Sequence, residues 1–147
     1  MLNVWETWFL YLVIYSFIGW AYESTVCSVA ERKLVNRGFL NGPICPIYGF
    51  GVLTAAKLLQ PFDENLLLLF IGSVLITTLL EYLTGFLLEK LFHQKWWDYS
   101  ALPFNIKGYV CLKFSLLWGL ACLFILKIIH PAVLKFIESL PGTLSTI

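Results

Sequence analysis

Residues 66–92 read LLLLFIGSVLITTLLEYLTGFLLEKLF, and this stretch decides the class of protein to which the chain belongs. A helix of about 20 apolar residues crosses the roughly 30 Å hydrocarbon core of a bilayer. The stretch exceeds that length and carries few charged side chains. It therefore predicts a helix that spans a membrane.

The composition of the whole chain agrees with this prediction. Of its 147 residues, 59% are hydrophobic and only 13% are charged, whereas soluble proteins carry about a quarter charged residues. The net charge of +1 gives no indication of nucleic-acid binding. The four cysteines and two histidines lack metal-ligand spacing, so we expect no metal and no cofactor. The chain is predicted to be an integral membrane protein with membrane lipids around it.

Apolar runs on both sides of 66–92 complete the predicted fold. Pro131 ends the last run, and the following residues, AVLKFIESL, resemble a short amphipathic helix at the membrane interface. The prediction is an all-α, polytopic membrane protein with a single transmembrane domain over residues 1–147. The four predicted spans are residues 4–26, 39–60, 66–92 and 109–129.

The second span is unusual because glycines and prolines interrupt it. Residues 36–51 read NRGFLNGPICPIYGFG. From Ile47 to Gln60 a helix would be only about 21 Å long, which is too short to cross. Pro43 and Pro46 prevent a regular hydrogen-bond ladder before it. Two interpretations stay open: a broken helix that offers backbone groups to a ligand, or a tight loop dipping into the headgroups.

Basic residues predict the orientation of the chain. They gather in the first and third connections, whereas the second connection, QPFDEN, is acidic. The positive-inside rule then places both long connections in the cytoplasm and both termini outside the plasma membrane. The basic residues of the two long connections are Arg32, Lys33, Arg37, Lys90, Lys95 and Lys107.

Polar residues inside the spans are the candidate functional groups. Thr77, Glu81, Gly85 and Glu89 share one helical face, and an ionised carboxylate at membrane depth costs roughly 2.5 kcal/mol or more. Glu81 is therefore either a protonated, hydrogen-bonded structural group or a functional one. Glu89 lies nearer the end of its span, where water can solvate it.

Glu23 ends the first span and also has two interpretations. It is either a carboxylate at the interface or the partner of Arg37, since neither charge is stable alone in a low dielectric. The third connection contains WWDYS (96–100) and FNIKG (104–108), which read as an aromatic belt, turns and a helix cap. The predicted orientation places all these polar groups in the cytoplasmic half, where they would line a polar cavity.

Several of these stretches resemble a known family. NRGFLNGPICPIYGFG and WWDYS, with FIGWAYE (17–23), EYLTGFLLEKLF (81–92) and FNIKG, resemble the bacterial CmpB-like family, labelled type IV ABC-transporter permeases. The second half also resembles a vertebrate transmembrane family that shares an E-x-x-T-G-F and W-D-Y-S pattern. The resemblance implies structural motif positions at Gly38, Gly42, Pro43, Pro46, Gly49, Gly85, Trp97, Ser100 and Gly108. The chain has no G-x-x-x-x-G-K-[ST] phosphate loop, so an ATPase would be a separate subunit.

Three functions remain compatible with the sequence. The first is a transporter or permease-like subunit, acting as a homodimer or in a larger complex. The second is a membrane enzyme acting on lipids at the cytoplasmic leaflet, with Glu81 or Asp98 as acid or base, although no nucleophile–base pair is evident. The third is a structural or assembly subunit. The candidate substrate- or ion-binding residues are Glu23, Asn36, Arg37, Tyr48, Glu81, Glu89, Asp98, Tyr99 and Asn105.

Overall fold

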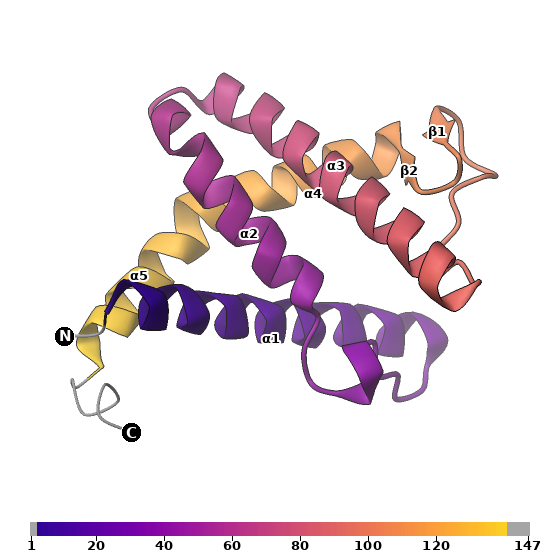
Figure 1. The fold of residues 1–147 in the computed structure, drawn as a ribbon, viewed down its shortest axis with the longest axis horizontal. Helices are drawn as coiled ribbons and strands as arrows, with labels where there is room; N and C mark the ends of the chain where they lie inside the picture. Colours follow the sequence, from indigo (N-terminus) through magenta and orange to yellow (C-terminus); the bar gives the residue numbers. More distant parts are fainter. Residues whose placement is uncertain (1–2, 141–147) are drawn as a thin grey trace. The chain divides into compact units, whose positions relative to one another are not determined.

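The computed structural model describes residues 3–140 and is built mainly of helices (Figure 1). A hairpin of two very short strands departs from the all-α prediction. The elements, in order, are α1 (Val4–Glu31), the 3-10 turn Phe39–Asn41, α2 (Pro46–Leu59), the 3-10 turn Gln60–Phe62, α3 (Leu66–Phe92), β1 (Asn105–Ile106), β2 (Val110–Cys111), α4 (Leu112–Phe124), the π-helical turn Ile125–Ile129 and α5 (His130–Ser139).

Three helices are long and apolar enough to cross a membrane. They are Val4–Glu31, Leu66–Phe92 and the continuous helix Leu112–Ser139, which combines α4, the π-helical turn and α5. The chain is therefore a membrane protein. Helix α2 has only 14 residues, too few to cross alone, so the four-span arrangement is not confirmed.

The predicted break at Pro131 is wrong. The chain stays helical from Leu112 to Ser139, although Pro131 has no N–H to donate to the preceding turn. The five residues before α5, Ile125–Ile129, form a wider π-helical turn. Such a turn changes the backbone pairing just ahead of the proline, so the helix tolerates Pro131 instead of ending there.

Local sequence signals set the ends of α1 and α3. The Asn3 side chain accepts from the Glu6 N–H while the Glu6 carboxylate accepts from the Asn3 N–H, which is a complete capping box. The Asn65 side chain accepts from two N–H groups at the start of α3. His93, in left-handed backbone with φ 55°, ends α3. These caps explain why α3 has the predicted bounds.

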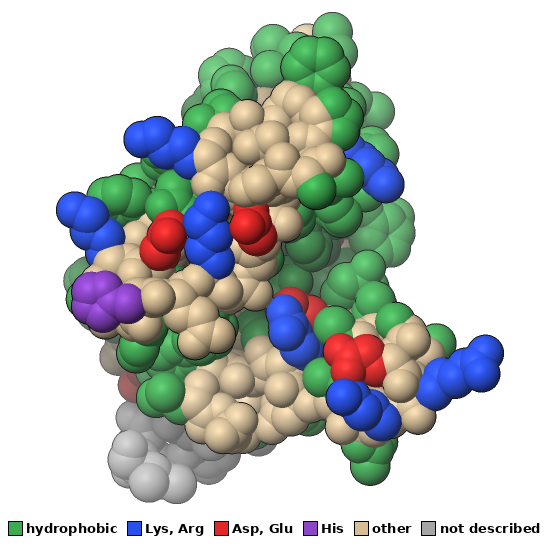
Figure 2. Space-filling view, turned by 90° about the vertical axis from the view of Figure 1, so that its right-hand side faces the viewer, with side chains coloured by type: hydrophobic (Ala, Val, Ile, Leu, Met, Phe, Trp, Pro, Cys, Tyr) green, Lys and Arg blue, Asp and Glu red, His purple; other side chains and the backbone are tan. Residues whose placement is uncertain are grey.

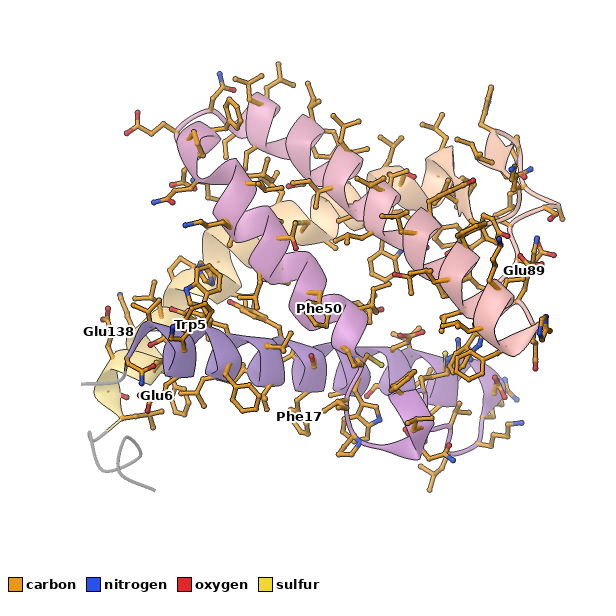
Figure 3. The ribbon with its side chains drawn as sticks, viewed as in Figure 1. Trp5, Glu6, Phe17, Phe50, Glu89 and Glu138 are labelled. Carbon is orange, nitrogen blue, oxygen red and sulfur yellow. The ribbon has the colours of Figure 1, made fainter. Side chains whose placement is uncertain are left out.

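Large hydrophobic side chains lie exposed on the helices. Trp5 and Phe17 of α1 and Phe50 of α2 are 84%, 49% and 57% exposed, and Figure 3 shows them labelled. On α3 the exposed positions follow one face, including Leu75 and Leu79. Water would disfavour such a surface, whereas the acyl chains of a bilayer would surround it without cost.

The described residues divide into two compact units. Unit 1 contains α1, the start of α2 up to Leu53, and α5; unit 2 runs from Thr54 to Ile129. In unit 1 the start of α2 packs closely on α1, because a Cβ at Gly19 would overlap the ring of Tyr48. Gly49 similarly lies against Ser16. Glycines thus let two backbones approach closely, as is common between membrane helices.

In unit 2, α3 packs along α4, and the hairpin joins them (Figure 1). The core consists of Ala55, Leu59, Leu69, Cys122 and Leu126. A Cβ at Gly119 would overlap Val74, so the small residues of α4 form a helix-packing seam.

Each long connection holds one large apolar residue in left-handed backbone. Leu40 has φ 50° and a 76% exposed side chain. Phe104 has φ 55° and a 79% exposed side chain. This backbone conformation favours glycine, so both residues adopt it against their intrinsic preference.

Candidate functional site

The structure places the candidate residues in two clusters, one in each unit. The cavity that both clusters were predicted to line stays a prediction. The Arg37 cluster contains Glu23, Asn36, Arg37 and Tyr48. The Glu81 cluster contains Glu81, Glu89, Asp98, Tyr99 and Asn105.

An ion pair lies at the centre of the Arg37 cluster. Arg37 Nε is 3.5 Å from Glu23 Oε1, and the Tyr48 hydroxyl donates to Glu23 Oε2 at 3.2 Å. The two charged side chains are 43% and 31% exposed, so the pair is half-buried. Arg37 is thus the partner of Glu23, as one of the two sequence interpretations proposed. In Figure 2 acidic and basic side chains stand next to one another among hydrophobic ones.

Asn36 organises the glycine- and proline-rich connection that carries Arg37. Its Oδ1 accepts from Trp20 Nε1 at 2.7 Å and from the Gly38 N–H at 2.9 Å, while its Nδ2 donates to Asn41 O at 2.9 Å. These bonds use both the oxygen and the nitrogen of the amide, so Asn36 holds the connection together and ties it to Trp20 of α1.

The backbone around the motif glycine and prolines is equally constrained. The Arg37 N–H donates to Ser24 Oγ at 3.1 Å, and the Cys45 N–H donates to Ser16 O at 2.9 Å. A Cβ at Gly38 would overlap the backbone of Gly42. The connection is therefore tied back to α1 at several points before Pro46 starts α2.

Glu81 is the most deeply buried candidate. Its side chain points into unit 2 and the residue is only 8% exposed. Oε1 accepts from the Tyr99 hydroxyl at 2.8 Å, and Trp118 of α4 supplies a further side-chain hydrogen bond. Oε2 is buried and has no hydrogen-bond partner among residues 3–140. The ring of Tyr99 is stacked on Phe114, with centroids 4.9 Å apart.

The third connection covers the α3 face that the sequence singled out. A Cβ at Gly85 would lie 3.1 Å from Tyr109 and 3.2 Å from Trp97, so these rings rest on the glycine. The Tyr109 hydroxyl donates to Glu89, and Trp97 Nε1 donates to Tyr109 O at 2.8 Å. Figure 3 shows Glu89 near the end of α3. Glu89 is thus hydrogen-bonded to Tyr109, whereas the sequence left both a solvated carboxylate and a functional one open.

Asp98 holds a turn in this connection. Its Oδ1 accepts from both the N–H and the hydroxyl of Ser100, and Lys95 Nζ lies 3.7 Å away. The two Ser100 hydrogen bonds, and then Lys95, lower the pKa of the Asp98 carboxyl, which is therefore ionised at neutral pH. This arrangement is that of a turn residue with its bonds satisfied, and it fits a catalytic acid poorly.

Asn105 and Gly108 complete the same connection. Asn105 Nδ2 donates to Leu102 O at 2.8 Å, and its Oδ1 accepts from the Gly108 N–H at 3.1 Å. Gly108 has φ 74°, and its carbonyl accepts from the Tyr99 N–H at 2.8 Å. Together these bonds fix the position of Tyr99. Burial and the neighbouring Glu81 raise the pKa of the Tyr99 hydroxyl, which therefore stays a donor.

Sequence reasoning missed Trp118 and Tyr109 as members of the Glu81 cluster. For Trp118 the available signal was its depth, because a Trp away from the interfacial belt needs an acceptor for its N–H. Among residues 3–140, no three His, Cys, Asp or Glu side chains gather as they would around a metal ion.

The sequence motifs and the comparison with protein families point to the same family. A family model described as "Putative ABC-transporter type IV" matches residues 10–147. The chain belongs to this family. The resemblance seen in the sequence is thereby confirmed, and the family name is that of a component of an ABC transporter. No curated protein and no solved structure matches the chain.

Proposed function

We propose that this type IV ABC-transporter family member is a membrane-embedded, permease-like subunit, and that its substrate or coupling ion passes Glu81. The observation that carries the proposal is the buried carboxyl of Glu81 in α3, with Oε2 unpartnered among the described residues. Ionisable groups inside spans are costly, so they usually mark pathways for ions or substrates.

The family and the motifs support a complex with other subunits. The sequence lacks a phosphate loop, so ATP hydrolysis would require a separate ATPase. A chain with so few spans would form a two-fold homodimer or join a larger complex in the bacterial plasma membrane. Residues 39–60 would then act as a broken span, with both long connections cytoplasmic and both termini outside.

The half-buried ion pair of Glu23 and Arg37 supports the proposal that these two side chains also belong to the pathway. They would line a cavity open to the cytoplasm. A lipid enzyme remains the alternative, but Asp98 is held by Ser100 and Lys95, and no observation among the described residues favours that chemistry.

Water access to position 81 tests the proposal. In a variant whose four native cysteines are replaced by alanine, Glu81→Cys is reconstituted into lipid vesicles and treated with a membrane-impermeant methanethiosulfonate reagent. We expect labelling, because a transport pathway must admit water or solute to this position. Leu79→Cys is the matched control, since Leu79 is 58% exposed at nearly the same depth and should face lipid.

The two outcomes separate the functions. Labelling of position 81 without labelling of position 79 supports a pathway. Absence of labelling at position 81 from either side, in folded protein, would overturn it and favour a structural subunit.

A further inference from the structure

Three side-chain polar atoms on α3 are buried without a hydrogen-bond partner among residues 3–140. They are Ser73 Oγ, Thr78 Oγ1 and Glu81 Oε2. Buried polar atoms in proteins are nearly always paired, and an unpaired one costs about 1–3 kcal/mol. Three such atoms on one helix are therefore expected to bind a ligand or a proton.

Glu81 and Thr78 lie on the same side of α3. They are three residues apart, and helical side chains lean toward the N-terminus, so the Glu81 carboxyl extends toward the turn that carries Thr78. Oε1 of the carboxyl already accepts from Tyr99. Oε2 is thus the free position.

Among residues 3–140, no lysine or arginine forms an ion pair with Glu81. The groups that act on the carboxyl are the Tyr99 hydroxyl from the third connection and the Trp118 indole from α4. Cys111 of β2 lies near Tyr99, while Lys113 of α4 sits over the ring of Phe114. An ionised carboxylate would therefore lack a counter-charge, whereas a protonated one needs none.

We propose that Glu81 binds and releases a proton at Oε2, and that Tyr99 is the movable cover of this site. The proposal rests on the proposed function and names the proton as its coupling ion. On release, the O–H bond of the carboxylic acid breaks and the proton passes to water, leaving a carboxylate. The Tyr99 and Trp118 donors then stabilise that carboxylate, so the site serves both protonation states.

Tyr99 is suited to act as a cover because it belongs to the third connection. Its ring rests on Phe114, its hydroxyl bonds to Glu81 and its N–H bonds to Gly108 O. The ring can leave Glu81 by giving up the hydrogen bonds of its hydroxyl with Glu81 and Trp118 and its stacking contact with Phe114, while the turn held by Asp98 and Ser100 stays formed.

Infrared spectroscopy of the protein in lipid nanodiscs tests the proposal. A protonated carboxyl gives a C=O band at higher frequency than the amide bands. We expect a band at neutral pH that Glu81→Gln removes and Glu89→Gln retains. Transfer to D2O should shift the band, because an exchanging proton is replaced by deuterium.

Tyr99→Ala tests the cover. In this variant the Glu81 carboxyl proton should exchange with solvent about tenfold faster, because the loss of one hydrogen bond of this type changes an equilibrium constant by about that factor. Tyr109→Phe is the matched control, since its hydroxyl bonds to Glu89 and not to Glu81. In Tyr99→Phe the band should persist to higher pH, since the carboxylate loses a donor.

The proposal would be overturned by a spectrum that Glu81→Gln leaves unchanged, or by a Glu81 band that never shifts in D2O. Equal exchange rates in Tyr99→Ala and the parent would remove the role of Tyr99. These results are independent of labelling at position 81. If position 81 is labelled but the band is absent, the transport proposal stands and the proton proposal fails. If the band is present but position 81 is not labelled, Glu81 binds a proton and no pathway passes it.

Discussion

Glu23 and Glu81 are both carboxylates carried by long apolar helices, yet their environments differ. Glu23 has a cation, Arg37, and both side chains are partly exposed. Glu81 is 8% exposed, and within residues 3–140 its hydrogen-bond donors are the neutral groups Tyr99 and Trp118. The difference teaches that a carboxyl group on an apolar helix can be satisfied in two ways, by an ion pair with a nearby cation or by neutral hydrogen-bond donors.

The largest expected effect concerns the glycines that hold each cluster. Gly19→Ala should destabilise unit 1 by about 1–3 kcal/mol, because the new methyl group overlaps the ring of Tyr48. Gly85→Ala is the matched change in unit 2, where the added Cβ lies 3.1 Å from Tyr109 and 3.2 Å from Trp97. Gly85→Ala should change the free energy of unfolding very little, since small shifts of the two rings make room for the methyl group and alanine favours the helix by up to about 1 kcal/mol.

Denaturant titration in mixed micelles gives both free energies of unfolding. In a Tyr48→Ala background the cost of Gly19→Ala should fall, because the overlapping ring is gone. Equal losses for the two glycine variants would contradict the close packing described for unit 1.

The next largest effect compares two tyrosine hydroxyls. Tyr48→Phe removes a donor to Glu23, and Tyr99→Phe removes a donor to Glu81. Hydrogen bonds to charged groups contribute about 1.5–3 kcal/mol and those between neutral groups about 1 kcal/mol. With Glu23 paired with Arg37 and Glu81 protonated as proposed, Tyr48→Phe should therefore lower the free energy of unfolding more than Tyr99→Phe at neutral pH. The opposite order would identify Glu81 as the charged acid.

A smaller effect is expected for the ion pair itself. Arg37→Ala should cost about 1 kcal/mol, because partly exposed pairs contribute little. The double variant with Glu23→Gln should recover part of that loss, since the glutamine carries no charge that needs a partner. A double-mutant cycle on the free energy of unfolding measures this coupling, and a coupling of zero would show that the pair adds nothing.

The smallest effect is local to the third connection. The pKa of Asp98 is lower in the folded protein than in the unfolded chain. Its contribution to the free energy of unfolding is therefore present above the ordinary aspartate pKa of about 3.9, and it is lost as the pH falls through the lower folded pKa. Hydrogen exchange at the Ser100 amide, which donates to Asp98, should lose protection in that acidic range. Asp98→Asn should abolish this pH dependence. Protection that is constant across that range in the parent protein would contradict it.

The sequence predicted α3 to its observed bounds because a long apolar run and an asparagine cap are local signals. The rule that proline ends helices failed at Pro131, since a π-helical turn absorbed it. The hairpin was missed because its strands, Asn105–Ile106 and Val110–Cys111, are too short for any periodicity.

For the candidate site, the sequence identified Glu81 from the cost of a charge at membrane depth. It also offered Arg37 as the partner of Glu23. It could not predict that Tyr99 bonds to Glu81, because that contact joins positions 18 residues apart through tertiary structure. The turn at Asp98 was among the sequence predictions, because its bond to Ser100 is local, whereas the contact of Asn36 with Trp20 joins positions 16 residues apart.

Leu40 and Phe104 show that stability within the chain does not explain every choice of residue. Each holds a backbone conformation that glycine would adopt freely, and each exposes more than three quarters of its side chain. The conformation costs roughly 1–2 kcal/mol per residue, and side chains as exposed as these bury little apolar surface among residues 3–140 in return. Glycine at either position should therefore relieve the backbone while giving up little packing among the described residues.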